Sequence, residues 1–452
     1  MKHKPKRPKT CCLISLGCPK NLVDSEKVLG IVRAKGIRLV RDAEKADLVI
    51  VNTCAFIGPA RAEARRTIEE VLRLKKRGKP RLVGVIGCFP QYASLNQTSL
   101  HEEYPDVDFV LGVFARGEID AVLGSLGEGD GVPEIVPGPC AAVLDDSDRY
   151  RVTLAHVAYL KIAEGCNRRC AYCTIPGIRG PQQSKRPQEI VAEAKRLADE
   201  GVRELILVAQ DTIGYGRDLP EGARLAELLD LLEGVRGIDW IRLMYLFPGR
   251  YVEESLIDAM NRNAKVLPYL DIPLQHTESE ILARMGRPAS KAFLEDLLST
   301  LRERIDGAVL RTTLITGFPG ETEAHFEAML DFVRRLRFER LGVFAYCDEP
   351  GTPAAEFDGK VPEQIAFERC DRILDAQKTI ALRWAKDRVG ETHRVLIDAP
   401  LDAEDAYIGR TPADAPDIDP VVYVTGRQLT PGQIVPCEIV ASQDYDLVGV
   451  PG

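Results

Sequence analysis

Short apolar runs alternate with helix-like patterns over about the first 120 residues. This rhythm predicts a small α/β unit with a parallel sheet. Three runs have the length and composition of buried parallel strands, at residues 12–16, 48–51 and 82–86. A cysteine follows closely after each run, and we call Cys18, Cys54 and Cys88 the N-terminal triplet. Because the carboxyl ends of parallel strands share one edge of a sheet, we expect these three thiols to converge in space.

The middle of the chain repeats a strand-and-helix rhythm six times. The predicted strands are residues 157–162, 204–209, 240–246, 268–274, 309–315 and 340–346. Between the first two, Pro187 suits the first turn of an amphipathic helix and Gly201 marks its end. Six such units favour an open or partial (β/α)6 barrel, in which chemistry belongs just after the strands.

Five short strands separated by Pro, Gly and Asp are predicted for the last segment, at residues 392–397, 407–410, 421–425, 434–441 and 446–450. They favour a small all-β barrel of an architecture that often binds nucleic acid. The charge indicates a different partner. Residues 391–452 contain 3 Lys and Arg against 11 Asp and Glu, a net charge of −8 that equals the charge of the whole chain. Such a segment repels a phosphate backbone and attracts a basic protein, so binding of tRNA is disfavoured.

Length and composition complete this outline of an α/β protein. With 452 residues, of which 45% are hydrophobic and 28% charged, the chain suffices for about three globular domains. We expect a basic tail at 1–10, an α/β domain at 11–125, a linker at 126–150, a barrel domain at 151–388 and the all-β domain at 389–452. No apolar run reaches about 18 residues and the start lacks an apolar signal segment, which favours a cytoplasmic protein that does not bind membranes.

Twelve cysteines in a chain without an export signal favour metal or redox chemistry over a disulfide framework. Cys166, Cys170 and Cys173, which we call the loop triplet, follow the first predicted barrel strand and offer three thiolates from one tight loop. Structural zinc sites are normally closed by four ligands. A 4Fe-4S cluster held by three cysteines leaves one iron free for another ligand. The position at the mouth of a predicted barrel favours such a cluster over a structural zinc ion.

The spacing of the loop triplet, with Tyr172 before its last cysteine, resembles the signature of the radical S-adenosylmethionine (SAM) superfamily. Residues 15–26, 46–54 and 85–88 resemble the N-terminal cluster-binding segments of the methylthiotransferases within that superfamily. The last segment, 389–452, resembles their TRAM domain. The resemblance spans nearly the whole chain and rests on several cysteine motifs in the expected order.

Four segments resemble the branch of this family that adds a methylthio group to the β-carbon of an aspartate in small-subunit ribosomal protein S-twelve. They are residues 18–26, 210–216, 268–276 and 413–419. The tRNA-modifying branch usually has Gln-Met-Asn after the first cysteine, where this chain has Pro-Lys-Asn. The acidic last segment agrees independently, since ribosomal proteins are basic. The alternatives are a tRNA adenosine methylthiotransferase and a non-catalytic iron–sulfur carrier.

The resemblance implies two 4Fe-4S clusters with different roles. The loop triplet would hold the cluster that reductively cleaves SAM to a deoxyadenosyl radical, which abstracts hydrogen from the aspartate. The N-terminal triplet would hold a second cluster, whose open iron carries the sulfur that another SAM methylates. SAM would thus be both methyl donor and radical source. The enzyme would also need an electron donor and a sulfur source as partners.

Four further residues are candidates for the neighbourhood of SAM. Tyr172 belongs to the loop-triplet motif, and Gln210 and Gln275 end the second and fourth predicted strands. Gly317 follows the fifth strand, in a turn that in this family resembles a SAM-contacting turn. Taken singly, a polar strand end or a simple glycine turn explains these residues as well. His276 either faces the barrel mouth or is a hydrogen-bonded structural histidine.

The other cysteines have simpler interpretations. We interpret Cys370 and Cys437 as small buried apolar side chains. Cys11 and Cys12 lie on the strand side of the turn that precedes the N-terminal triplet, so ligation by them would need a different register. Cys347 stands where the family pattern usually has serine. The basic tail is interpreted as a solvated terminus in preference to an RNA contact.

Overall fold

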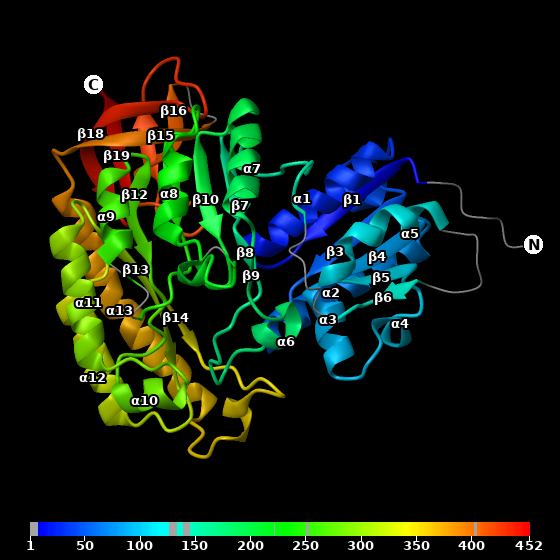
Figure 1. The fold of residues 1–452 in the computed structure, drawn as a ribbon, viewed down its shortest axis with the longest axis horizontal. Helices are drawn as coiled ribbons and strands as arrows, with labels where there is room; N and C mark the ends of the chain where they lie inside the picture. Colours follow the sequence, from blue (N-terminus) through cyan, green and yellow to red (C-terminus); the bar gives the residue numbers. More distant parts are fainter. Residues whose placement is uncertain are drawn as a thin grey trace, which may run out of the picture.

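The computed structural model describes residues 8–125, 133–138, 145–220, 222–249, 252, 254–401 and 405–452. Most of the predicted basic tail and much of the predicted linker, with Cys140, lie outside these residues. The described residues form an N-terminal α/β unit, a central parallel sheet with its helices, and a C-terminal β-barrel (Figure 1). The predicted fold class, α/β with a partial barrel and a small all-β barrel, is therefore confirmed.

The N-terminal unit is built on a six-stranded parallel sheet in the order β2–β1–β3–β4–β5–β6. Its strands are β1 (Thr10–Ser15), β2 (Arg38–Leu39), β3 (Leu48–Thr53), β4 (Leu82–Gly87), β5 (Phe109–Gly112) and β6 (Glu134–Ile135). Its α-helices are α1 (Pro19–Ala34), α2 (Gly58–Lys76), α3 (Cys88–Leu95), α4 (Leu100–Glu103) and α5 (Ile119–Ser125). The unbroken apolar strands β3 and β4 are wholly buried, as predicted. Strands β2, β5 and β6 were not predicted, because each has at most four residues.

The central unit is a second six-stranded parallel sheet, in the order β14–β13–β12–β11–β10–β7. Its strands are β7 (Val157–Lys161), β10 (Glu204–Val208), β11 (Trp240–Leu243), β12 (Val266–Asp271), β13 (Val309–Thr316) and β14 (Arg340–Ala345). Its helices are α6 (Ile175–Arg179), α7 (Pro187–Asp199), α8 (Leu225–Glu233), α9 (Glu254–Arg262), α10 (Ser279–Arg284), α11 (Lys291–Arg304) and α12 (Glu323–Leu336). Because β7 and β14 are the two edges, the sheet is an open partial barrel.

Two strand ends differ from the prediction. Strand β11 ends at Leu243, three residues early, and Tyr245 beyond it has a φ of 63°, in the left-handed region. Strand β12 ends at Asp271 instead of residue 274, because Pro273 has no N–H to donate to a neighbouring strand. A two-stranded ladder of β8 (Ala163–Glu164) with β9 (Gln183–Ser184) was also not predicted, and it brackets the loop triplet.

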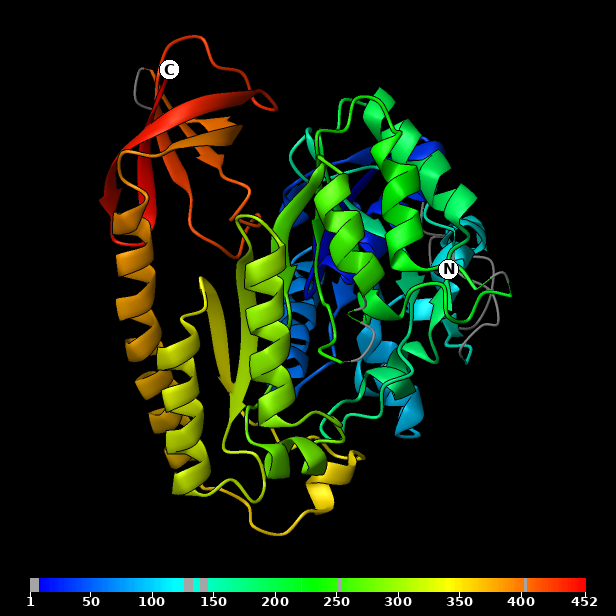
Figure 2. The same cartoon turned by 60° about the vertical axis from the view of Figure 1, so that its left-hand side comes forward.

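The last segment closes into a five-stranded barrel in the order β15–β16–β17–β19–β18. Its strands, β15 (Thr392–Pro400), β16 (Ala406–Arg410), β17 (Val422–Thr425), β18 (Ile434–Gln443) and β19 (Asp446–Pro451), correspond to the five predicted ones. Helix α13 (Glu363–Asp387), orange in Figure 2, leads from the central unit into this barrel. No helix among the described residues is long and apolar enough to cross a membrane.

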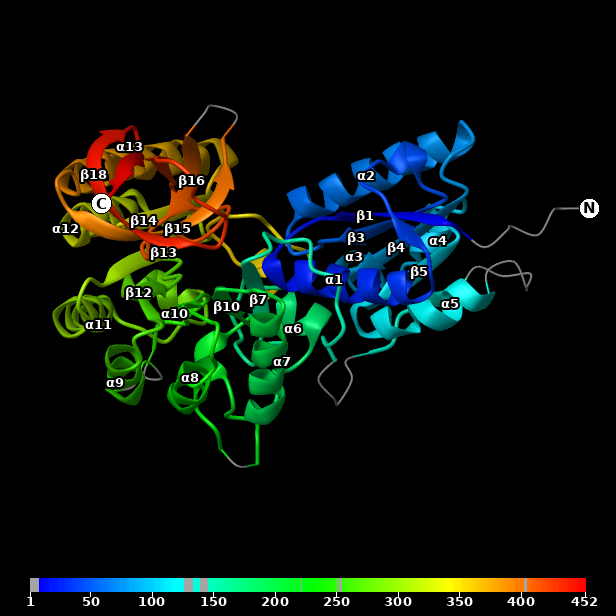
Figure 3. The same cartoon turned by 90° about the horizontal axis from the view of Figure 1, so that it is seen from above.

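The two outer units are attached to different parts of the central unit (Figure 3). Helix α1 contacts β7 and helix α3 contacts α6, so the N-terminal unit lies against the strand end that carries the loop triplet. The C-terminal barrel is anchored at the amino end of the sheet. There Glu204, at the start of β10, accepts hydrogen bonds from Arg242 at 2.8 Å and Arg410 at 2.6 Å, and all three side chains are buried.

Candidate active site

One cavity of about 380 Å³ lies where the N-terminal unit meets the carboxyl ends of the central strands. Its lining includes every member of the N-terminal triplet and of the loop triplet. All six cysteines are free thiols. The two cysteine groups, which the sequence places in separate domains, thus share a single cavity.

The N-terminal triplet converges because three parallel strands end at the same edge. Cys18 is the N-cap of α1, Cys54 follows β3, and Cys88 is the first residue of α3. Gly17 makes this convergence possible, since its φ is 96° and a Cβ there would lie 2.8 Å from the Cβ of Cys54. Gly87 allows a similar close approach, because a Cβ there would lie 2.2 Å from the Oδ1 of Asn52.

The charges around the N-terminal triplet shift the pKa values of its thiols in different directions. Burial alone would raise the pKa of Cys18, but Lys20 and Arg179 outweigh this effect and hold the pKa below its ordinary value. For Cys88 burial dominates and raises the pKa to about 11, against the lowering effect of Arg179. Burial also raises the pKa of Cys54. Cys18 is therefore the thiol of this triplet that is most readily deprotonated.

The loop triplet lies between β8 and α6, on a loop fixed by backbone hydrogen bonds. The N–H of Cys166 donates to the carbonyl of Gly180 at 3.0 Å, and the N–H of Ala171 donates to that of Met285 at 2.9 Å. Burial raises the pKa of Cys166 to about 11 and that of Cys173 to about 12. These two thiols are thus protonated at neutral pH until a metal displaces the protons.

Cationic side chains outnumber carboxylates in the lining of the cavity, and carboxylates pair with three of these cations. Its described lining has one carboxylate, Asp271, and five cationic side chains, Lys20, Arg168, Arg179, Arg287 and Arg311. The Nη1 of Arg287 lies 3.7 Å from the Sγ of Cys170, and the Nζ of Lys20 lies 3.4 Å from the centre of the Tyr245 ring. Such a lining suits anionic occupants, which include thiolate-bound clusters and carboxylates.

Three of the four predicted SAM neighbours line the cavity, and the fourth packs elsewhere. Tyr172, Gln210 and Gln275 line the cavity. Gly317 is not among its described lining residues, and a Cβ there would lie 2.4 Å from that of Ala366 on α13. The turn at Gly317 therefore faces the long C-terminal helix, which the local sequence did not reveal.

His276 has the structural role that was one of its two interpretations. Its side chain is wholly buried, and its Nδ1 accepts a hydrogen bond of 3.0 Å from the N–H of Glu278. Its Nε2 therefore carries the proton and donates to Glu321 at 3.2 Å. Among the cavity residues, sequence analysis missed the cations. Lys20 stands two residues after Cys18, a usable signal, whereas nothing local to Arg179 indicated a role.

The remaining described cysteines lie outside the cavity. Cys11, Cys12, Cys370 and Cys437 are buried, and none of them is among the lining residues. Burial agrees with the interpretation of Cys370 and Cys437 as small apolar side chains, but the Sγ of Cys370 also lies 3.0 Å from the Oγ1 of Thr316. The Sγ of Cys347 lies 3.1 Å from Glu349, at the contact between the loop after β14 and α2.

The residues present fit an iron–sulfur cluster and a polar ligand beside it. Within the described ranges, no set of three or more His, Cys, Asp and Glu side chains is arranged to hold a single metal ion. A cluster presents a separate iron to each thiolate, so its ligands stand farther apart than those of one ion. The cavity also contains a buried oxygen without a hydrogen-bond partner, the Oε1 of Gln210. An unpaired buried oxygen in a cavity wall is a natural contact for a bound ligand.

Three family models match successive parts of the chain. The Uncharacterized protein family UPF0004 matches residues 10–112, the Radical SAM superfamily matches 160–333, and the TRAM domain matches 389–451. The chain is also similar to curated proteins over nearly its full length. A Myxococcus xanthus protein named ribosomal protein uS12 methylthiotransferase RimO is 43% identical over 443 residues, which are 98% of this chain and 91% of that protein.

The chain belongs to the RimO family of methylthiotransferases. A second RimO protein, from Desulforamulus reducens, is 42% identical and covers 97% of this chain and 98% of its own length. With the radical SAM match, this places the chain among the radical SAM methylthiotransferases, with an iron–sulfur cluster and SAM as cofactors. Membership of the RimO family removes the non-catalytic carrier from the alternatives.

Solved structures agree with the fold of this RimO-family chain. The radical SAM methyltransferase TsrM from Kitasatospora setae, bound to tryptophan and a SAM analogue, has a TM-score of 0.55 at 16% identity. The match covers 76% of this chain and 75% of TsrM. At this identity the likeness concerns the fold alone.

Proposed function

We propose that the chain adds a methylthio group to the β-carbon of an aspartate in ribosomal protein uS12, which is protein S-twelve of the small subunit. The observation that carries this proposal is the single cavity lined by both cysteine triplets. A carbon-centred radical and a sulfur donor must meet before the radical reacts elsewhere, and a shared cavity supplies that proximity. The names of the relatives support the choice of uS12.

We further propose that each triplet holds one 4Fe-4S cluster. When bound, these clusters and SAM supply reductive formation of a deoxyadenosyl radical, a sulfur atom and a methyl group. The loop triplet holds the cluster that binds SAM, and the N-terminal triplet holds the cluster that carries the sulfur. Tyr172, Gln210 and Gln275 line the cavity, and we assign to them the contacts with SAM. The buried Oε1 of Gln210 has no hydrogen-bond partner and would accept one from the polar groups of SAM.

The cations of the cavity match the proposed substrate. The reacting side chain is an aspartate, and SAM also carries a carboxylate. Arg168 is held by Asp211 at 2.7 Å, whereas Arg287 donates to the carbonyl of Pro273 at 2.6 Å, so both guanidinium groups have fixed positions. We assign the orientation of the two carboxylates to Arg168, Arg287 and Arg311. Held at fixed positions, these groups bind carboxylates without reorganising.

The C-terminal barrel supports a protein substrate. The net charge of −8 over residues 391–452 favours a basic ribosomal protein over a nucleic acid. We place the protein in the cytoplasm, where uS12 is made and assembled, and we assign it an electron donor and a sulfur source as further partners.

The test is anaerobic reconstitution with iron and sulfide, reduction in the presence of SAM, and mass spectrometry of two substrates offered together. These are purified uS12 and unmodified tRNA. We expect methylthio addition on one aspartate of uS12 and none on tRNA. Modification of tRNA alone would overturn the proposal.

A further inference from the structure

A buried arginine of the central unit reaches across to the N-terminal triplet. Arg179, at the end of α6, is 2% exposed, and its Nη2 lies 3.1 Å from the Sγ of Cys88. Its Nη1 donates to Asp24 on α1 at 2.8 Å and to Glu164 on β8 at 3.0 Å. The guanidinium is therefore fixed by one carboxylate from each unit. Asn21 on α1 provides a further contact, at 3.4 Å from Nη2.

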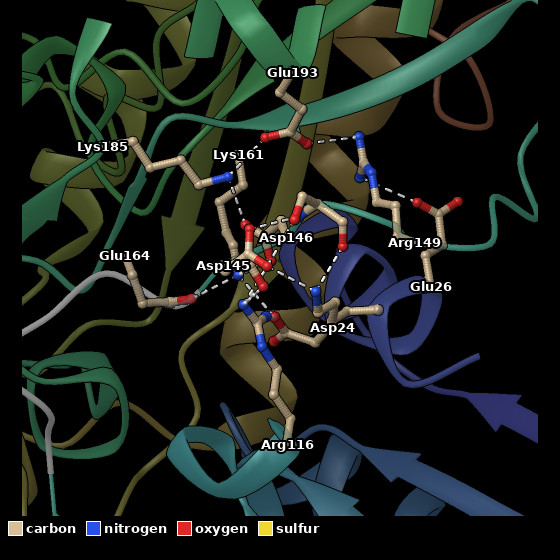
Figure 4. A network of polar contacts seen from close by, with 12 residues as sticks. Asp24, Glu26, Arg116, Asp145, Asp146, Arg149, Lys161, Glu164, Lys185 and Glu193 are labelled. Atoms are coloured by element: carbon tan, nitrogen blue, oxygen red, sulfur yellow. Dashed lines mark hydrogen bonds and ion pairs between the residues drawn. The ribbon is translucent and has the colours of Figure 1, made fainter. Parts of the chain in front are cut away.

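The two carboxylates that fix Arg179 belong to a larger buried network, shown in part in Figure 4. Asp24 also accepts from Lys161 at 2.7 Å and from Arg116. Glu164 also accepts from Lys161 at 2.9 Å and from Gln210 at 2.6 Å. Lys161 is wholly buried. The buried members with acidic side chains are Asp24, Glu26, Asp146, Glu164 and Glu193, and those with basic side chains are Arg116, Arg149, Lys161, Arg179 and Lys185.

Equal numbers of buried acids and bases make this network nearly neutral by itself. The pairs of Asp24 with Lys161 and with Arg179 cross the boundary between the units, and removing one partner of such a pair leaves an uncompensated buried charge. The network thus locks α1 to β7, β8 and α6. A continuous series of contacts, Cys88 to Arg179 to Glu164 to Gln210, then connects the N-terminal triplet with the wall of the cavity.

We propose that Arg179 is a positioning residue for the cluster on the N-terminal triplet. Its guanidinium donates a hydrogen bond to the thiolate of Cys88 and raises the reduction potential of that cluster, and it does so only when the two units are docked. Hydrogen bonds to cluster sulfurs stabilise the reduced, more negative state. This inference rests on the proposed function, in which the N-terminal triplet holds a 4Fe-4S cluster.

The contacts of Arg179 indicate that it acts on the cluster through its hydrogen bond to Cys88 and not through its charge alone. Asp24 and Glu164 flank the guanidinium, so much of its positive charge is already compensated. An arginine presents several N–H groups in a planar fork and can serve Asp24, Glu164 and Cys88 at once. A lysine keeps the charge but has a single nitrogen, which cannot reach all three.

The experiment isolates the N-terminal cluster in the full chain by replacing the three loop-triplet cysteines with alanine. A redox titration followed by electron paramagnetic resonance then gives the midpoint potential of the remaining cluster. We expect Arg179→Lys to shift that potential to a more negative value. Arg116→Lys is the matched control, because Arg116 is also buried, pairs with Asp24 and Asp146, and donates no hydrogen bond to a thiol among the described residues. We expect it to leave the potential unchanged.

A second variant keeps the inference testable if Arg179→Lys does not retain a cluster. Glu164→Gln removes one negative charge beside Arg179 and preserves the shape of the side chain, so we expect a shift to a more positive potential. Unchanged potentials in cluster-bound variants, or equal shifts in Arg179→Lys and Arg116→Lys, would overturn the inference. Absence of any cluster from the loop-triplet variant with Arg179 intact would overturn the proposed function as well. This outcome distinguishes failure of the proposed function from failure of the inference about Arg179 alone.

Discussion

The Oε2 of Glu349 accepts a hydrogen bond of 2.6 Å from the Nη1 of Arg61, and this contact ties the loop after β14 to helix α2. The Oε1 of the same carboxylate accepts from the N–H of Gly58, also at 2.6 Å. The Glu349 side chain is 1% exposed. Side-chain contacts therefore connect the N-terminal unit to the central unit near both edges of the partial barrel. Glu349, beyond β14, makes them at one edge, and Arg179, near β7, makes them at the other.

Breaking the Glu349–Arg61 contact should loosen the N-terminal unit. We expect a double-mutant cycle of Glu349→Gln and Arg61→Gln in urea denaturation to give a coupling energy of about 1–3 kcal/mol, because the carboxylate is desolvated. The exposed pair Arg335 and Asp331, with side chains 48% and 63% exposed, is the control. Its coupling should be about 0–0.5 kcal/mol. Additive effects of the two substitutions at Glu349 and Arg61 would contradict this prediction.

The two triplets should contribute independently to the iron content. We predict about eight iron atoms per reconstituted chain, and about four after alanine replaces either triplet. Cys370→Ala and Cys437→Ala are the controls, since both thiols are buried away from the cavity. They should keep the full iron content. Loss of all iron on replacement of one triplet would contradict two separate sites.

Gly17 should be essential for the N-terminal cluster. In Gly17→Ala the new Cβ would lie 2.8 Å from that of Cys54, which must move, so we expect about half the iron to be lost. Gly36→Ala separates this clash from backbone strain. Gly36 also has a positive φ, of 76°, but nothing lies within 4 Å of its would-be Cβ. Iron analysis with the same result for both variants would refute the steric explanation.

Acid should weaken the anchor of the C-terminal barrel. Burial would raise the pKa of Asp398, but hydrogen bonds with His156 and Arg410 lower it below the ordinary value. The stability that this carboxylate contributes is therefore present above its ordinary pKa of about 3.9 and is lost as the pH falls below it. We expect the Tm difference between the wild type and Asp398→Asn to shrink between about pH 4 and pH 2.

An exposed carboxylate provides the comparison for that pH series. Asp331→Asn, on the surface of α12, should leave Tm nearly unchanged at each pH at which Asp398→Asn is measured. A Tm difference for Asp398→Asn that stays constant down to about pH 2 would show that the ionised carboxylate does not stabilise the barrel.

The sequence was sufficient to predict the convergence of the cysteines. Runs of apolar residues define parallel strands, and a residue just after each strand must lie at the shared edge. Cys18, Cys54 and Cys88 obey this rule, and the loop triplet follows β7 in the same way. The shared cavity depends on how the two units dock, which no local pattern encodes.

The residues that docking brings together were accordingly missed. Lys161 is a lysine within an apolar strand, yet it is wholly buried between carboxylates of both units. Arg179 ends a five-residue helix without any motif. Gly317 is a different case, because its turn has a recognisable pattern but packs against α13, and its role toward SAM stays a prediction. Side chains whose partners come from distant segments need the tertiary structure.

The most direct test follows a single hydrogen atom. The wild-type chain is reconstituted, reduced and offered SAM with uS12 whose aspartates carry deuterium at the β-carbon, and the deoxyadenosine formed is analysed by mass spectrometry. Radical abstraction at that carbon predicts deuterium in deoxyadenosine, in step with methylthio addition to uS12. Unlabelled deoxyadenosine accompanying a methylthiolated product would contradict hydrogen abstraction from the aspartate β-carbon.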